Sequence, residues 1–423
     1  METTLLRLNK HWDGEKYLSL HERFLVENLK KKKNLPHIQV LTGIRRSGKS
    51  AIFRLMINDL MDSRINPKEI LLLNLDEPVF TNLWNNVSEL YKVIEMVERI
   101  TAVKVSYLFL DEVQQVKDWE LFAKGAYDTQ RFRKIYITGS NSDLLQNKFA
   151  TLLSGRYFAN TVRPLSLKEL LHLHGFTDRY SSLSRRTELL RLMDQYMEWG
   201  SFPEIVLNQM DESVKIELLN NYYESIVLKD CIVYNQVRDA SLFHRLLYFL
   251  ISNAGSPFYY NSLAKAVKSN ENTSRNYLAY AHRSYVISDI TNFSFSLKED
   301  ARAQHKVYGI DNGLMNAVGF QFLQRSGMLL ENTVYNELVN NGYSTISFAR
   351  QNGECDFIAQ KENQFHAFQV CYELNPLNQS REMAGFNVFG KLPLASKTLL
   401  TYNQEDSIDD VRVIPFWQFF GID

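Results

Sequence analysis

The chain has 423 residues, of which 45% are hydrophobic and 23% charged, a composition typical of a folded protein with two or three domains. Lys and Arg number 48, as do Asp and Glu, so any attraction to nucleic acid or to an acidic membrane must come from a local patch. The apolar runs fall short of the roughly 18 residues that a membrane span needs. With scattered cysteines and no signal-peptide core in residues 1–10, we expect a cytoplasmic protein that does not contact a membrane.

Strand-like and helix-like segments alternate through about the first 170 residues. Short apolar runs predict buried strands at residues 37–42, 70–75, 107–110 and 135–138. Helical spacing of apolar residues predicts helices at residues 50–62, 86–105 and 119–130. Strands that alternate with helices are typical of an α/β fold with a parallel sheet. Residues 183–249 then read as almost wholly helical with a break at 200–203, and after residue 327 one helix precedes further strands.

The segment after the first predicted strand fits the P-loop pattern Gly-x-x-x-x-Gly-Lys-Ser/Thr, and a predicted helix follows it. Glycines in this pattern let the backbone wrap around a phosphate, while loop amides and the helix N-terminus point at the anion. We expect Lys49 to bridge the β and γ phosphates and the Ser50 hydroxyl to bind Mg²⁺. The candidate nucleotide-binding residues are consecutive: Gly43, Ile44, Arg45, Arg46, Ser47, Gly48, Lys49, Ser50 and Ala51.

Two carboxylates, Asp111 and Glu112, end the strand predicted at residues 107–110. Asp111 is placed to bind Mg²⁺ through water, and Glu112 to orient and polarise an attacking water as a general base. The next predicted strand ends in polar residues, of which Asn141 is the first choice and Ser140 the second for contact with the γ-phosphate or its water. An ordinary polar turn is the alternative there. The P-loop and the carboxylates together predict a nucleoside triphosphate hydrolase.

Arg156 is a further catalytic candidate, because an arginine that reaches the phosphates of its own or a neighbouring subunit stabilises developing charge. A surface ion pair is the alternative interpretation. The guanine-reading pattern Asn-Lys-x-Asp is absent, since Phe149 and Ala150 follow Asn147 and Lys148. ATP is therefore favoured over GTP.

These motifs resemble the AAA-type ATP-binding domain of a large prokaryotic family whose members carry a C-terminal domain of unknown function, DUF4143. The resemblance rests on segments spread over most of the chain, at residues 43–50, 110–113, 137–142, 154–156, 163–166, 200–204, 308–314 and 354–357. It implies a P-loop ATPase core of the ASCE/AAA type that binds ATP and Mg²⁺, a winged-helix module and a restriction-endonuclease-like α/β domain. It implies no substrate.

We expect four parts along the chain. These are a P-loop ATPase domain at residues 1–175, a helical linker or lid region at 176–255, a winged-helix-like module at 256–310 and a nuclease-like domain at 311–423. In the third part, residues 262–267 and 273–283 predict two helices joined by a turn, and residues 293–295 suit a β wing.

The second of these helices is a candidate for entry into a DNA major groove, with Ser274, Arg275, Asn276 and Arg283 expected to face outward. Residues 261–306 carry only seven Lys and Arg against four Asp and Glu, a modest excess for a DNA-binding module. Contacts within the protein or with a protein partner are therefore the alternative to DNA.

Restriction-type nucleases hold Mg²⁺ with a helix Glu, a strand Asp and a Glu-x-Lys on the next strand. Here Glu331 or Glu337 lies on the predicted helix and Asp356 on a strand, but the third position reads Gln369-Val370-Cys371. Because Gln is a weak ligand for a hard cation and Cys cannot replace an ammonium, we expect the fold without nuclease activity.

The sequence therefore predicts a Mg²⁺-dependent ATPase whose nucleotide state drives domain rearrangement at DNA or at a protein partner. The alternative is a slow ATP/ADP regulatory switch that acts through protein contacts in signalling or defence. An ATP-regulated nuclease is the least favoured function, and the oligomeric state is left open.

Overall fold

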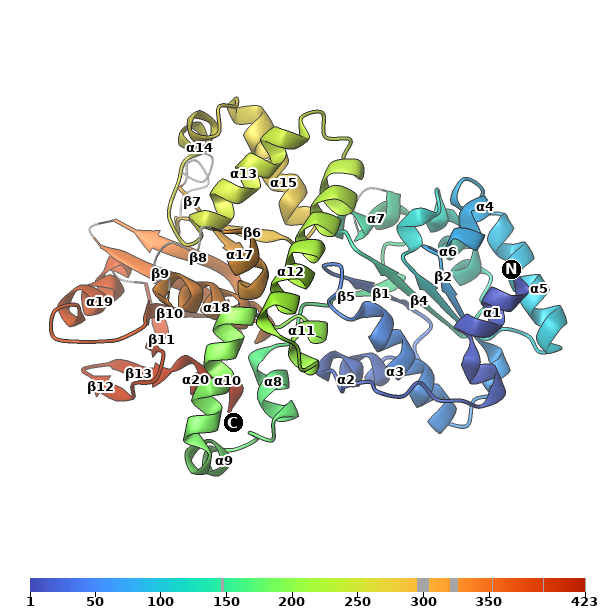
Figure 1. The fold of residues 1–423 in the computed structure, drawn as a ribbon, viewed down its shortest axis with the longest axis horizontal. Helices are drawn as coiled ribbons and strands as arrows, with labels where there is room; N and C mark the ends of the chain where they lie inside the picture. Colours follow the sequence, from blue (N-terminus) through green and yellow to red (C-terminus); the bar gives the residue numbers. More distant parts are fainter. Residues whose placement is uncertain (146–147, 295–303, 320–325, 352, 391, 423) are drawn as a thin grey trace. The chain divides into compact units, whose positions relative to one another are not determined.

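The structure, a computed structural model, describes residues 1–145, 148–294, 304–319, 326–351, 353–390 and 392–422 (Figure 1). The chain forms two compact units, which we call unit 1 (Met1–Val162) and unit 2 (Arg163–Asp423). The four-part division expected from the sequence stays a prediction. Among the described residues, no helix combines the length and the apolar character that a membrane span requires.

Unit 1 is built on a parallel sheet of five strands in the order β2-β3-β4-β1-β5. The strands are β1 (Ile38–Thr42), β2 (Ile70–Asn74), β3 (Tyr107–Asp111), β4 (Lys134–Gly139) and β5 (Tyr157–Thr161). The four strands predicted from apolar runs are confirmed, and so is the parallel arrangement. Because neighbouring strands run in the same direction, the segments that follow β1, β3 and β4 all leave the sheet at its carboxyl edge.

Helices cover both faces of this sheet, as the continuous apolar character of β1 to β4 requires. They are α1 (Glu2–Leu8), α2 (Phe24–Lys31), α3 (Lys49–Asp62), α4 (Thr81–Trp84), α5 (Glu89–Thr101), α6 (Trp119–Asp128) and α7 (Lys148–Leu152). Short 3-10 turns complete the unit: η1 (Lys10–Asp13), η2 (Pro67–Glu69), η3 (Pro78–Phe80), η4 (Val113–Gln115) and η5 (Ser142–Leu145).

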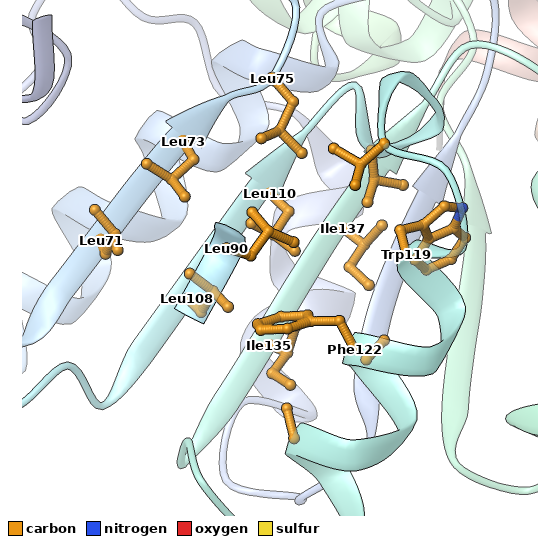
Figure 2. Packing of buried hydrophobic residues seen from close by; sticks show 14 of the residues in the cluster. Leu71, Leu73, Leu75, Leu90, Leu108, Leu110, Trp119, Phe122, Ile135 and Ile137 are labelled. Carbon is orange, nitrogen blue, oxygen red and sulfur yellow. The ribbon is translucent and has the colours of Figure 1, made fainter. Parts of the chain in front are cut away.

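Successive side chains of each strand point to opposite faces of the sheet, so each face has a core of its own. On one face, Leu108 and Ile137 belong to a core that Leu90 of α5 and Phe122 of α6 complete (Figure 2). The intervening residues Phe109 and Tyr136 reach the opposite face, where their rings stack at 4.4 Å between centroids. Phe53 of α3 packs edge-on against both rings. The core thus holds α3, the helix that follows the P-loop, firmly on the sheet.

Unit 2 contains a helical region followed by a mixed sheet. Its helices are α8 (Leu167–Leu173), α9 (Arg179–Ser184), α10 (Arg186–Trp199), α11 (Pro203–Leu207), α12 (Glu212–Ile226), η6 (Val227–Val233), α13 (Ala240–Ser252), α14 (Tyr260–Ala266), α15 (Glu271–Arg283), α17 (Asn312–Val318), α18 (Ser326–Asn340), α19 (Gln379–Gly385), η7 (Phe386–Phe389) and α20 (Phe416–Gly421). The expected break is confirmed at Gly200, where φ is +72° and a Cβ would lie 2.1 Å from Asp311 Oδ1. Only glycine fits this position, because both the backbone angle and the space exclude a side chain.

Two sheets occur in the described part of unit 2. Strands β6 (Ile287–Thr291) and β7 (His305–Gly309) form an antiparallel pair after α15. The second sheet has the order β12-β13-β11-β10-β9-β8 and mixes parallel with antiparallel pairs. Its strands are β8 (Ser344–Arg350), β9 (Glu354–Lys361), β10 (Gln364–Cys371), β11 (Leu394–Thr401), β12 (Asp406–Ile408) and β13 (Val411–Pro415).

Candidate nucleotide site

The loop between β1 and α3 has the backbone of a phosphate cradle. Gly43 has a φ of +145°, and a Cβ there would lie 2.0 Å from the Val162 carbonyl oxygen, so a side chain is excluded. Arg46 and Gly48 also have positive φ, of 71° and 99°, and α3 begins at Lys49. Loops with such turns before a helix present backbone amides to an anion, which the helix N-terminus also favours. Ser50 and Ala51 lie in the first turn of α3.

Lys49 is buried, and its ammonium contacts the backbone of this loop. Its Nζ donates to the carbonyl oxygens of Gly43, at 2.8 Å, and Ile44, at 3.1 Å. The same ammonium is 4.0 Å from Glu112 Oε1. A buried ammonium needs such oxygen partners, and phosphate oxygens are of the same chemical kind. The lysine is therefore positioned at the cradle itself.

Asp111, the last residue of β3, accepts hydrogen bonds from two hydroxyl groups. Ser50 Oγ donates to Asp111 Oδ2 at 2.6 Å, and Thr138 Oγ1 donates to the other carboxylate oxygen. Thr138 also accepts from the Glu112 amide at 2.9 Å. Burial, and then the neighbouring charge of Glu112, raise the pKa of Asp111. A second positive charge nearby would favour the ionised carboxylate, and a hydroxyl beside a carboxylate is a donor set that suits Mg²⁺.

Glu112 follows Asp111 in a left-handed backbone conformation, with φ at 56°. For a residue other than glycine this conformation costs on the order of 1 kcal/mol or more, and such strain clusters at functional sites. Gln114 Nε2 donates to Glu112 Oε2 at 2.5 Å and contacts Ser140 Oγ at 3.3 Å. The carboxylate is thereby held by an amide from η4, while its other oxygen faces Lys49.

Asn141 follows β4 at the same edge of the sheet and is 3% exposed. Its Oδ1 accepts from the Asp143 amide at 2.8 Å, whereas Nδ2 has no hydrogen-bond partner among the described residues. Ser47 Oγ in the P-loop is likewise buried without a partner in the described part of the chain. Buried polar groups are normally hydrogen-bonded, so an unsatisfied donor and an unsatisfied hydroxyl beside a phosphate cradle fit a polar ligand.

Arg156 lies elsewhere in unit 1. It precedes β5, and its carbonyl accepts from the amide of Ile38, the first residue of β1. This places it at the amino edge of the sheet, about 16 Å of strand away from the P-loop. Its guanidinium pairs with Asp128 at 3.1 Å. The structure thus shows the ion pair that was the alternative interpretation and does not bring Arg156 to the phosphate site of its own chain.

A second polar cluster lies in unit 2. Glu331 on α18 and Asp356 on β9 meet around Lys306 of β7, which no sequence pattern singled out. Glu337 accepts instead from the Leu167 amide at 3.1 Å and the Tyr196 hydroxyl at 2.9 Å, inside the core. Gln369 donates to Glu382 at 2.8 Å. Of the two helix candidates, only Glu331 therefore joins the cluster with Asp356.

The helix pair expected at residues 262–283 is confirmed as α14 and α15. The expectation that Ser274 faces outward is wrong, because it is fully buried at a core position of α15. Arg275 and Asn276 are exposed. Arg275 pairs with Glu271 at 2.7 Å, and its guanidinium lies 3.9 Å from the centroid of the Tyr260 ring. Arg283 lies over the Tyr280 ring at 5.7 Å.

The wing expected at residues 293–295 falls partly outside the described residues, which omit 295–303. Phe293 is described. It packs against the mixed sheet, with its amide donating to the Phe348 carbonyl oxygen at 2.7 Å.

Comparison with known sequences places these observations in a family. The AAA-domain family (AAA_14) matches residues 36–171, which contain the whole candidate nucleotide site. A domain of unknown function (DUF8612) matches residues 190–326, and the resemblance to DUF4143 stays a prediction. The protein is thus an AAA-domain protein with a P-loop at the carboxyl edge of its parallel sheet.

Relatives that align with most of the chain show which protein family it belongs to. The chain is 31% identical over 405 residues to the uncharacterized protein MJ1544 of Methanocaldococcus jannaschii, across 90% of this chain and 88% of that protein. It belongs to the same family as MJ1544. An uncharacterized protein of Haemophilus influenzae is 28% identical across 90% of this chain and 94% of its own length.

Solved structures give weaker likenesses. The ORC1 protein of Aeropyrum pernix, in complex with DNA, aligns with 69% of this chain and 90% of its own at 12% identity and a TM-score of 0.32. AMPPCP-bound DnaA of Aquifex aeolicus aligns with 61% of this chain and 86% of its own at 12% identity and a TM-score of 0.30. Neither likeness carries an argument about function.

Proposed function

We propose that the protein binds ATP with Mg²⁺ in unit 1 and hydrolyses it. The observation that carries the proposal is the meeting of four side chains at one edge of the sheet. Ser50 Oγ lies 2.6 Å from Asp111 Oδ2, and Lys49 Nζ lies 4.0 Å from Glu112 Oε1. The orphaned polar atoms of Ser47 and Asn141 beside the same loop support it. Sequence reasoning missed Thr138 and Gln114. The only sequence signal for Thr138 was its position near the end of β4, and the only one for Gln114 was its position just after the paired carboxylates.

In the proposed reaction, Lys49 transfers its hydrogen bonds from the loop carbonyls to phosphate oxygens and balances their charge. Ser50 and Asp111 hold Mg²⁺, which neutralises charge on the phosphates when bound. Glu112 accepts the proton of the attacking water, whose oxygen forms the new bond to the γ-phosphorus while the bond to the bridging oxygen breaks. Asn141 Nδ2 donates to the γ-phosphate or to this water, with Ser140 as the second candidate. Because Arg156 does not reach the phosphate site of its own chain, any stabilisation of developing charge by Arg156 would act on the phosphates of a neighbouring subunit.

Two variants test this assignment of roles. Glu112→Gln keeps size and hydrogen bonding but removes the base, so hydrolysis should fall by roughly 10²- to 10⁴-fold with ATP affinity nearly unchanged. Lys49→Ala removes a charge from the cradle and should weaken nucleotide binding itself. Phosphate release measures turnover, and equilibrium titration with a fluorescent ATP analogue measures binding. Equal turnover in wild type and Glu112→Gln would contradict the role of Glu112.

We further propose that nucleotide state rearranges the helical half of the chain at DNA. The features that favour DNA are the pair α14–α15 followed by the β6–β7 hairpin, which is the element order of a winged helix, and the exposed Arg275 and Asn276. The alternative, a slow ATP/ADP switch that contacts a protein in signalling or defence, is favoured by the pairing of Arg275 with Glu271 and by the neutral net charge. Filter binding to duplex DNA at two salt concentrations, with and without ATP, separates them, because phosphate contacts must weaken with salt.

For the C-terminal part we propose a restriction-endonuclease-like fold, as the DUF4143 resemblance implies, without nuclease activity. The succession of α18, three antiparallel strands β8–β10 and the parallel strand β11 supports the fold. The neutral Gln369 at the third ligand position supports the lack of cleavage. Nicking of a plasmid with Mg²⁺ or Mn²⁺ that persists in Lys49→Ala and vanishes in Asp356→Ala would contradict it.

A further inference from the structure

Lys306 is the most deeply buried charged group of the cluster in unit 2. It is 1% exposed, on the short strand β7, and it lies among carboxylates from two other elements. Its Nζ is 3.1 Å from Glu331 Oε1 on α18, and 2.8 Å from Glu354 Oε1 and 3.8 Å from Asp356 Oδ1 on β9. The three carboxylates line a pocket of about 710 Å³. A single ammonium therefore lies at the point where three acidic side chains converge.

This arrangement has the charge pattern of a carboxylate cation site. Carboxylates that converge in a partly buried place repel one another unless a positive charge lies between them. Burial alone would lower the pKa of Lys306, but Glu331, Asp356 and Glu354 together raise it, so the side chain stays charged. The positive charge that the three acids require is thus already present, on a side chain of the same chain.

Several oxygens of the cluster have further partners. Glu331 Oε1 accepts from the Tyr308 hydroxyl at 2.7 Å, in addition to its contact with Lys306. Glu354 Oε2 is 3.5 Å from Arg350 Nε, and Asp356 Oδ2 accepts from the Val370 amide at 2.8 Å. A divalent cation needs several such oxygens at once, in a shell of six or more ligands for Mg²⁺ or Ca²⁺. Each of these engaged oxygens would have to leave a present partner to join that shell.

The charge balance points the same way. Besides Lys306, Arg350 pairs with Glu354, and Arg381 pairs with Glu382, a fourth acid that lines the same pocket. Three positive side chains thus face four acidic ones, which leaves little net negative charge to attract a divalent metal.

We infer that Lys306 is the resident cation of this carboxylate cluster and takes the place that a divalent metal would occupy between its acids. The cluster is therefore metal-free in the working protein, and the lysine is supplied by β7, outside the helix and the one strand that provide the acids. This inference concerns unit 2 and does not depend on ATP hydrolysis.

The test is to count Mn²⁺ bound to the full chain by electron paramagnetic resonance, without nucleotide. Lys306→Met removes the ammonium while keeping a long side chain, and it should gain one Mn²⁺ per chain relative to wild type. The gain should disappear in Lys306→Met combined with Asp356→Asn. Lys397→Met is the matched control, because Lys397 belongs to the same unit but pairs with Asp410, at 2.7 Å, and it should gain no Mn²⁺.

Stability gives a second readout on the same variants. Lys306→Met leaves three carboxylates without their cation, so its melting temperature should fall, and Mn²⁺ should restore part of the loss. A folded Lys306→Met protein that takes up no additional Mn²⁺ would overturn the inference. If Lys306→Met does not fold, the Mn²⁺ count of the single variant Asp356→Asn is compared with that of wild type. A Mn²⁺ count that falls below the wild-type count places a metal in the native pocket and overturns the inference, and an unchanged count supports it.

Discussion

Gln114 gives the sharpest prediction for the nucleotide site, because its amide is the hydrogen-bond donor that the structure places on the carboxylate of Glu112. Gln114→Ala removes this donor and the contact to Ser140. A hydrogen bond to a charged group contributes about 1.5–3 kcal/mol. If Glu112 keeps the bond while it polarises the water, the barrier rises by that amount, and about 1.4 kcal/mol corresponds to a tenfold change in rate. We therefore expect kcat for ATP hydrolysis to fall by about 10- to 150-fold.

A positioning role predicts a specific pattern of kinetic constants. Gln114→Ala should lower kcat, while KM and the affinity for a non-hydrolysable ATP analogue stay close to wild type, because the side-chain amide of Gln114 donates to Glu112 and Ser140 and not to the phosphate loop. Gln115→Ala is the matched control, since its neighbouring amide donates to Asp76 at 2.8 Å instead. An unchanged kcat in Gln114→Ala, or an equal loss in Gln115→Ala, would refute the reasoning. A wild type that binds ATP without hydrolysing it would refute the proposed ATPase and leave the role of Gln114 without an activity to act on.

Two further predictions concern the helical module and the pH dependence of stability. If α15 meets DNA, the double change Arg275→Ala and Arg283→Ala should weaken DNA binding and flatten its salt dependence by at most about two units, with ATP binding retained; an unchanged slope would exclude these contacts. Burial lowers the pKa of His11 to about 4 from 6.5, so the unfolded chain binds the proton more readily and stability falls as pH drops through this window. Between pH 7 and pH 4, urea unfolding should show wild type losing about 3 kcal/mol more than His11→Gln; parallel losses would contradict the assignment.

The elements that sequence reasoning located best are those in which local pattern and final environment agree. Strands β1 to β4 are buried on both faces, so their apolar runs, such as the one ending at Asp111, are unambiguous. The P-loop is equally local, because Gly43, Gly48 and Lys49 act through a single turn between one strand and one helix. Both could be predicted because the local sequence pattern alone identifies them.

The parts that escaped prediction depend on contacts between distant segments. Lys306 and Glu331 are 25 positions apart and on different elements, so no spacing rule connects them. Thr138 joins Asp111 only because β4 lies beside β3, which a list of strands does not reveal. Ser274 shows the converse error. A polar residue at the start of a helix suggests exposure, but its place in the 3.6-residue repeat, beside the core residues Tyr277 and Leu278, turns it inward.

The position of Lys306 also has a consequence for any attempt to study the parts of this protein separately. A fragment cut at residue 311, the start of the nuclease-like domain expected from the sequence, would contain Glu331, Glu354 and Asp356 but not their ammonium. The complementary fragment that ends at residue 310 would carry a lysine whose oxygen partners are missing. Each piece would be destabilised by charge that the other neutralises. A dissection between Val162 and Arg163, where the two compact units divide, leaves this electrostatic balance intact.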